Sequence, residues 1–161
     1  MKSIPIVAAT LLTLPLFAQT PPPAVPHDPA IVFPMPDVHM QLDQLIAAAK
    51  EKGSSGATIE DYGSYKIQLS ARTASGGGEV HAHWDDVMMV ERGSATLITG
   101  GTVVDARTTP DGETHGSRID GGRSQKINPG DVLTVRAGTP HQIILDPGAV
   151  YGAVVIKVHE P

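Results

Sequence analysis

Apolar and polar side chains alternate along the chain from Tyr65 to Arg72. Since successive side chains of a strand point to opposite faces, this period of two predicts a half-buried antiparallel strand. Further short strands are expected between turn signals at residues 100–101, 121–122 and 146–148. These strands are predicted over residues 94–99, 102–105, 125–127, 131–136, 141–145 and 151–158.

Between Asp37 and Lys52 the apolar positions follow a helical period instead. Asp37 is predicted to cap the N-terminus of this helix, and Gly53 is placed to end it. One amphipathic helix followed by many short strands, with no repeating alternation of helix and strand, favours an all-β sandwich or barrel over a parallel sheet. The helix is expected to pack on the outside of a sheet through Met40, Leu42, Leu45 and Ile46.

The first residues have the pattern of a signal peptide, predicted over residues 1–18. Lys2 gives a positive start, an uncharged apolar stretch follows, and Ala18 precedes the expected cleavage point. We therefore expect an exported protein, periplasmic or secreted, with no stable membrane span after cleavage. The alternative is an uncleaved anchor, although the stretch is short for a transmembrane helix. Residues 19–36 are proline-rich and predict an extended linker before a domain over residues 37–161.

Composition narrows the function classes. A chain of 161 residues is long enough for one domain with a hydrophobic core. The net charge of -5 and the lack of a basic patch in the sequence give no indication of nucleic-acid binding. The chain has no cysteine, which excludes disulfides, thiolate nucleophiles and cysteine-ligated zinc. The glycine runs do not form a dinucleotide fingerprint, and no nucleophile elbow or P-loop is present.

Two histidines stand two residues apart in the stretch from Gly78 to Gly93. If this stretch is one extended strand, His81 and His83 point to the same side, where two imidazoles can hold one metal ion. Asp86 follows, and a third histidine, His141, lies far downstream after glycines 130 and 138.

This combination resembles the two signature motifs of the cupin superfamily. The residues that match are HxHxxD, six residues and glycine, followed by glycine, five residues and RAGTPH. The resemblance to small, single-domain cupins of type 2 implies a double-stranded β-helix, that is, a jelly-roll barrel, and a homodimer formed by sheet packing. Two positions depart from the motifs, because Asp86 stands for the usual glutamate and Arg136 for the usual proline.

Carried over by motif position, the resemblance implies metal ligands at His81, His83, Asp86 and His141. Imidazole and carboxylate ligands suit a divalent ion of manganese, iron, zinc, nickel or cobalt. Asp86 has a short side chain, so the alternative is a site of three histidines with Asp86 behind them. A second alternative is a barrel that keeps the motif and binds no metal.

A ligand pocket is expected beside the metal, and its candidate residues come from both motifs. Met88 is as well explained by core packing. Nothing in the sequence fixes the direction of the polar candidates. The residues proposed to contact a substrate are Tyr65, Trp84, Met88, Arg136 and Gln142.

The connection between the two motifs is long, and its excess falls around residues 107–123. It is either a solvated hairpin or a segment over the barrel mouth that carries Glu113, His115 and Arg118. Glu79 and Glu113 are the two carboxyl groups considered for acid or base chemistry.

Three function classes remain open. The first is a metal-dependent enzyme, such as a dioxygenase, isomerase or lyase, that acts on a small oxygen-containing substrate. The second is a non-catalytic cupin module that binds a small ligand. The third is a structural, partner-binding protein, which accounts for the proline-rich segment but leaves the histidines without a role. Fold alone does not choose among them.

Overall fold

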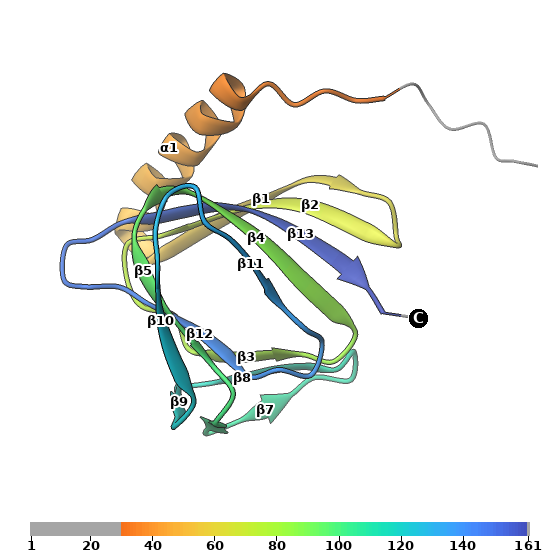
Figure 1. The fold of residues 1–161 in the computed structure, drawn as a ribbon, viewed down its shortest axis with the longest axis vertical. Helices are drawn as coiled ribbons and strands as arrows, with labels where there is room; N and C mark the ends of the chain where they lie inside the picture. The colour runs from red at the N-terminus through yellow and green to blue at the C-terminus, as the bar shows by residue number, and fades with distance from the viewer. Residues whose placement is uncertain (1–29, 161) are drawn as a thin grey trace, which may run out of the picture. The chain divides into compact units, whose positions relative to one another are not determined.

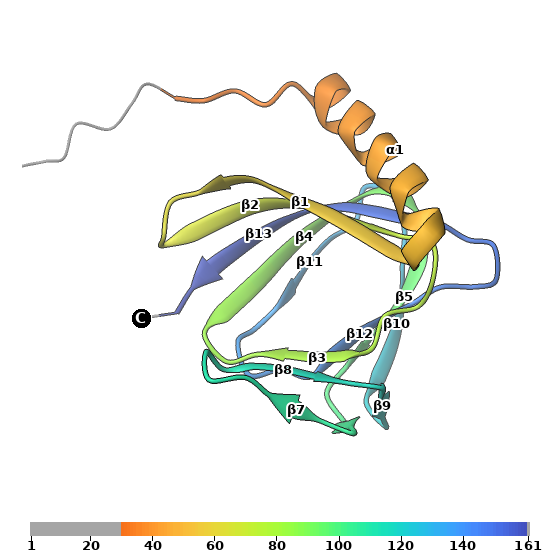
Figure 2. The same ribbon diagram turned by 180° about the vertical axis from the view of Figure 1, so that it is seen from behind.

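The alternating segments form the strands of an antiparallel barrel, preceded by one helix (Figures 1 and 2). This computed structural model describes residues 30–160, so the predicted signal peptide and residues 19–29 of the predicted linker lie outside the described residues. The chain divides into two units, and the helix and all described strands belong to the unit that begins at Phe33. The expectation of an all-β fold with one preceding helix is confirmed.

Two sheets make up the barrel, and a short pair of strands extends it. The first sheet has the spatial order β1-β2-β13-β4-β11, with β1 at Ser54–Asp61, β2 at Tyr65–Arg72, β13 at Tyr151–His159, β4 at Trp84–Gly93 and β11 at Val132–Val135. The second has the order β10-β5-β12-β3-β8-β7, with β10 at Arg123–Ile127, β5 at Ala95–Thr99, β12 at His141–Ile144, β3 at Gly78–His81, β8 at Glu113–Gly116 and β7 at Arg107–Thr108. The short pair is β6 at Thr102–Val104 with β9 at Arg118–Asp120.

Most of the predicted strands are present within one or two residues of their expected ends, and β2 has the predicted bounds. The alternation does not predict β1 or the three strands β7, β8 and β9. It also joins β3 and β4 into one strand, whereas a bend at residues 82–83 separates them. This bend decides where the two neighbouring histidines point.

The helix α1, Met35–Lys52, begins earlier than predicted. Its N-cap is Pro34, whose carbonyl accepts hydrogen bonds from the backbone N–H groups of Asp37 and Val38. Asp37 therefore lies in the first turn, where its charge suits the helix dipole, and its prediction as the N-cap is wrong. Gly53 ends the helix as expected, because its φ of 83° is left-handed and its N–H donates to the Ala49 carbonyl at 2.7 Å.

One face of α1 packs on the outer face of the first sheet. Leu42 is fully buried, and it clusters with Val38 of the helix, Leu69 of β2 and Val154 of β13. Packing of the helix on a sheet through Leu42 is thus confirmed, while Leu45 is partly buried in the same cluster. The prediction that Met40 is buried is wrong. Met40 is 54% exposed, because it lies about 200° around the helix from Leu42.

The main core lies between the two sheets. Its members come from the inward faces of strands in both sheets, and Gly93 closes the turn beneath them with a φ of 62°. A Cβ at Gly93 would lie 1.8 Å from the Val150 carbonyl oxygen, so only glycine fits there. The core consists of Met88, Val90, Ala95, Leu97, Ile127, Val135, Ile143, Leu145, Tyr151, Ala153 and Val155.

The polar face of β2 points into the barrel. Ile67 and Leu69 pack toward the helix, while Gln68, Ser70 and Arg72 line an internal cavity. Alternation was therefore a correct signal for the strand, but the period alone does not tell which face meets solvent. In residues 30–160, no helix combines the length and the hydropathy needed to cross a membrane.

Candidate metal and ligand site

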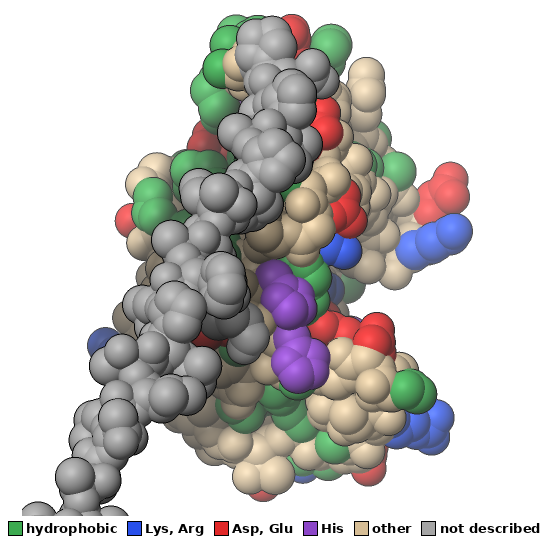
Figure 3. Space-filling view, turned by 90° about the vertical axis from the view of Figure 1, so that its right-hand side faces the viewer, with side chains coloured by type: hydrophobic (Ala, Val, Ile, Leu, Met, Phe, Trp, Pro, Cys, Tyr) green, Lys and Arg blue, Asp and Glu red, His purple; other side chains and the backbone are tan. Residues whose placement is uncertain are grey.

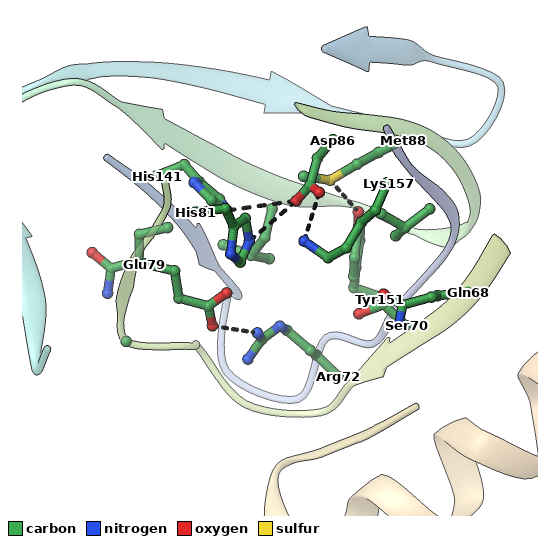
Figure 4. Close-up of a pocket in the computed structure, with 14 residues that line it drawn as sticks. Gln68, Ser70, Arg72, Glu79, His81, Asp86, Met88, His141, Tyr151 and Lys157 are labelled. Carbon is green, nitrogen blue, oxygen red and sulfur yellow. Dashed lines mark hydrogen bonds and ion pairs between the residues drawn. The ribbon is translucent and has the colours of Figure 1, made fainter. Parts of the chain in front are cut away.

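A cavity of about 200 Å³ lies inside the barrel, between the inner faces of the two sheets (Figure 4). Its walls come from β2, β3, β4, β12 and β13. Three of its lining residues also belong to the apolar core, namely Met88, Ile143 and Val155. The ionisable side chains that line it are Arg72, Glu79, His81, Asp86, His141, Tyr151 and Lys157.

Two of the predicted histidines meet the predicted acid in this cavity. His81 is the last residue of β3, His141 is the first of β12, and Asp86 comes from β4 in the facing sheet. Oδ2 of Asp86 lies 3.4 Å from Nε2 of His81 and 3.8 Å from Nε2 of His141. All three residues are buried, and the two ring centroids are 5.0 Å apart. These three side chains, which the resemblance to the cupin motifs implied as ligands, therefore lie in one cluster.

Glu79 joins the two histidines from the same strand as His81. One ligand atom from each of Glu79, His81 and His141 lies within 4.8 Å of the others. Because Glu79 and His81 are two residues apart on an extended strand, they share a face. The pair that alternation places together on β3 is therefore Glu79 and His81.

His83 does not join this cluster. The strand ends at His81, and the Ala82 N–H turns away to bond the Gly112 carbonyl at 3.2 Å. His83 is exposed, and its ring stacks on that of His159 with centroids 6.2 Å apart. Figure 3 shows histidine side chains together on the surface of one face of the molecule. The expectation that His81 and His83 face the same side is wrong, because it required an unbroken strand.

Both buried imidazoles are held by their Nδ1 atoms. Nδ1 of His81 is hydrogen-bonded to the carboxylate of Glu113, which lies opposite His81 where β3 pairs with β8. Nδ1 of His141 is 3.1 Å from the Thr139 carbonyl oxygen, which can only accept a hydrogen bond. In the neutral tautomers that donate these bonds, Nε2 of each ring carries a lone pair, and both Nε2 atoms face Oδ2 of Asp86.

Asp86 has a second partner on its other oxygen. Lys157 of β13 donates from Nζ to Oδ1 of Asp86 at 2.7 Å, and its side chain is only 18% exposed. One oxygen of Asp86 is therefore turned to the imidazoles and the other to the ammonium group. This division allows Asp86 to contact an ion between the imidazoles while Lys157 fixes the orientation of its carboxylate.

The electrostatics of the cluster follow from these contacts. Burial works against a charged Asp86, but the hydrogen bonds of His81 and Lys157 outweigh it and lower the pKa of Asp86. Burial also works against a charged His81, yet its bonds to Asp86 and Glu113 raise the pKa of this imidazole. For His141 burial prevails, and it lowers the pKa so that the ring is kept neutral.

Two solved structures share this arrangement of strands. The protein TT1209 from Thermus thermophilus matches with a TM-score of 0.53 at 14% identity, over 73% of this chain and 94% of that one. The Cnp3 cupin domain of Schizosaccharomyces pombe matches with a TM-score of 0.50 at 9% identity, over 66% of this chain and 61% of that one. The chain has the cupin fold. No family model and no curated protein matches the sequence.

At these identities the likeness shows the fold alone, and the description of the site rests on its own geometry. Of the residues expected to contact a substrate, Met88 and Gln142 line the cavity. Sδ of Met88 lies 3.8 Å from the Tyr151 hydroxyl. The Gln142 amide is occupied in the scaffold, since it accepts from the Ile119 N–H at 2.9 Å and donates to the Gly76 carbonyl at 2.7 Å.

The other three candidates lie outside the cavity. Tyr65 stacks on Tyr62 at the start of β2, with ring centroids 4.7 Å apart. Trp84 packs edge-on against His159, also at 4.7 Å, and does not line the cavity. Arg136 is 72% exposed and pairs with carboxylates on the surface. Their placement as substrate contacts is not supported, because all three are held by surface neighbours.

The cavity also contains basic groups that the sequence did not point to, Arg72 and Lys157. A signal for Lys157 was present: it shares the face of Tyr151 and Val155, so it is a charge in phase with buried residues. Arg72 gave no such signal, because the polar face of β2 is expected at the surface.

The long connection between the two motifs contributes strands to the second sheet and to the short pair. Its strand β8 pairs with β3 and with β7, and β9 pairs with β6. Glu113 points inward to His81, whereas His115 and Arg118 are exposed. The long connection thus supplies the Glu113 carboxylate to the site, while its other two candidate residues, His115 and Arg118, lie at the surface.

Tyr151 gives the folding stability of this protein a predicted pH dependence. Burial raises the pKa of Tyr151 to about 12. Because the usual tyrosine pKa is about 10, the protonated phenol stabilises the fold below pH 10, and this contribution is lost as the pH rises toward 12. Between pH 9 and pH 11, the Tyr151→Phe variant is expected to lose about 1 kcal/mol less unfolding free energy than the wild type, as measured by urea denaturation. An equal loss in both proteins would contradict the raised pKa.

Proposed function

We propose that this chain is an exported cupin that binds one divalent metal ion through His81, His141 and Asp86, and that it is a metal-dependent enzyme for a small oxygen-containing substrate. The observation that carries the proposal is the convergence of two imidazole Nε2 atoms on one carboxylate oxygen, at 3.4 and 3.8 Å. Such separations suit atoms that contact the same ion at about 2.0–2.2 Å.

The donor set fits a metal ion in its chemistry as well as in its spacing. Each imidazole has its Nδ1 hydrogen-bonded, which leaves Nε2 as the metal-binding atom. Glu79 is within reach as a further oxygen ligand. Nitrogen and carboxylate ligands suit manganese, iron, cobalt, nickel or zinc. With three or four protein ligands, coordination positions stay open for a substrate.

A bound divalent ion supplies Lewis-acid chemistry or, if it is redox-active, the activation of oxygen. The protein residues hold and orient the ligand beside it. Glu79 and Lys157 line the cavity beside the cluster, and we propose them for proton transfer at the substrate. Isomerase, lyase and oxygenase reactions on an oxygen-containing substrate all use such a set.

Export is proposed on the pattern of residues 1–18 and on that alone. It matters for the metal, because the compartment decides which ions are offered. The protein for metal analysis is therefore purified in its mature form from its own export compartment.

The test is metal content by plasma mass spectrometry on the wild type and on a His81→Ala, His141→Ala double variant. We expect about one equivalent of metal in the wild type and almost none in the variant, because two of three ligands are lost. The matched control is His115→Ala, which removes an exposed histidine and should keep the full content. A wild type without metal, or equal metal in the wild type and the double variant, would refute the proposal.

A further inference from the structure

We propose that the ligand of this cavity is a small carboxylate anion, held by Arg72 of β2 and Lys157 of β13 on the side opposite the imidazoles. The inference rests on the proposed function, since it assumes that a divalent ion binds between His81, His141 and Asp86. It adds the charge and the class of the molecule that fills the remaining space.

The two basic groups face the same space. Figure 4 shows the guanidinium of Arg72 and the ammonium of Lys157 pointing into the cavity from neighbouring strands, toward the side that carries His81 and His141. Strands β2 and β13 are paired, so both side chains come from one wall. They are largely buried, with 20% and 18% of the side chains exposed. Burial of this kind is unusual for lysine and arginine unless their charges are compensated.

In the absence of a metal ion, each basic group is compensated by one acid of the same cavity. Arg72 Nη2 lies 3.3 Å from Oε1 of Glu79, and Lys157 Nζ lies 2.7 Å from Oδ1 of Asp86. Apart from the histidines, the cavity lining thus balances two positive against two negative side chains. Both acids are also candidate metal ligands.

Metal binding breaks this balance. A divalent ion adds two positive charges to a lining that is already neutral, and Glu113 behind His81 offsets only one of them. Charges are costly in a buried, weakly polar site unless they are paired. The metal-loaded cavity is therefore expected to select an anion over a neutral ligand of the same shape.

The remaining donors indicate a carboxylate. Among the described residues, Arg72 donates one side-chain hydrogen bond, to Glu79, so most of its five N–H groups are available. A guanidinium binds the two oxygens of a planar carboxylate in parallel. Gln68 and Ser70 add neutral hydrogen-bonding groups on the same wall. The volume of about 200 Å³ is below the range of about 300–1,000 Å³ that drug-sized ligands occupy, so the anion must be small.

The experiment compares malonate with its neutral analogue malonamide by isothermal titration calorimetry. The titrated protein is metal-loaded, mature and dialysed free of excess metal, and metal content is measured on every sample. We expect malonate to bind at least tenfold more tightly than malonamide. Inorganic phosphate is titrated as a second anion, since a guanidinium binds phosphate as well as carboxylate through two oxygens. Phosphate is expected to bind more weakly than malonate, because malonate has two separate carboxylates, one for the metal ion and one for the basic groups.

Two variants test the residues. Both variants are first loaded to the same metal content as the wild type, because Lys157 and Arg72 contact candidate metal ligands. At equal metal content, Arg72→Gln and Lys157→Gln should each weaken malonate binding at least tenfold and weaken malonamide binding much less. Arg72→Lys keeps the charge and should recover part of the affinity, which a purely structural role would not explain. The controls are Arg92→Gln and Lys66→Gln, which remove basic groups paired with Asp43 and Asp61 outside the cavity and should bind malonate like the wild type.

The outcomes separate the two proposals. A metal-loaded wild type that binds malonate no better than malonamide, or that prefers phosphate, overturns the inference and leaves the metal site in place. Equal malonate affinity in the wild type and in the two glutamine variants overturns it as well. A wild type that takes up no metal refutes the proposed function and, with it, this inference.

Discussion

Replacing Glu113 by glutamine is expected to weaken the metal affinity of the proposed site about 10- to 100-fold. Glu113 bonds Nδ1 of His81, so its carboxylate fixes the ring orientation and makes Nε2 a more basic ligand. Glutamine keeps the size and the ability to accept a hydrogen bond, but it removes the negative charge. The loss is therefore expected in metal affinity, with little change in the fold.

The measurement is a competition titration against a chromogenic chelator with one metal ion throughout. Glu113→Asp retains the charge and should recover part of the affinity if the shorter side chain still reaches the ring. Glu51→Gln, at an exposed position of α1, is the matched control for the loss of one carboxylate. Equal affinity in Glu113→Gln and Glu51→Gln would show that His81 does not depend on this partner.

The dependence on Glu113 also shows where prediction from the sequence stops. Local patterns predicted the secondary structure well. The alternation of apolar and polar residues predicted β2 with its observed bounds, and Gly53 ends the helix as expected. These local signals work because they depend on period and on glycine conformations that the chain itself dictates. The grouping of His81, Asp86 and His141 across two sheets came from the resemblance to the cupin motifs instead.

The errors arise where a contact between distant segments decides the outcome. His83 was placed with His81 because a regular strand was assumed, but the Gly112 carbonyl in the long connection captures the Ala82 N–H and bends the chain there. The same connection carries Glu113 to His81 through the pairing of β8 with β3. Local period contains no information about such a pairing.

The orientation of β2 is a second case. A strand with one polar face is expected to turn that face to solvent, but in this barrel the helix α1 covers the apolar face. Arg72 then points to the interior, where its charge matters for the ligand. A helix laid on the outer face of a sheet thus reverses the usual assignment of faces, and the helix pattern itself was visible in the sequence.

Replacing Leu42 by alanine is therefore expected to destabilise the whole domain, by about 2–5 kcal/mol. Leu42 is fully buried between α1 and the sheet, against Leu69 and Val154. Its truncation removes buried apolar surface and leaves a cavity that the surrounding strands can fill only partly. Urea denaturation followed by circular dichroism measures the change in unfolding free energy.

Met40→Ala is the matched control on the same helix. Met40 is 54% exposed, and its truncation is expected to change stability by no more than about 0.5 kcal/mol. If the two variants were equally stable, α1 would not belong to the cooperative unit of the barrel. The expected difference means that the helix fixes the outer faces of β2 and β13, whose inner faces carry Arg72 and Lys157. The wall that holds the proposed anion would then depend on packing on its far side.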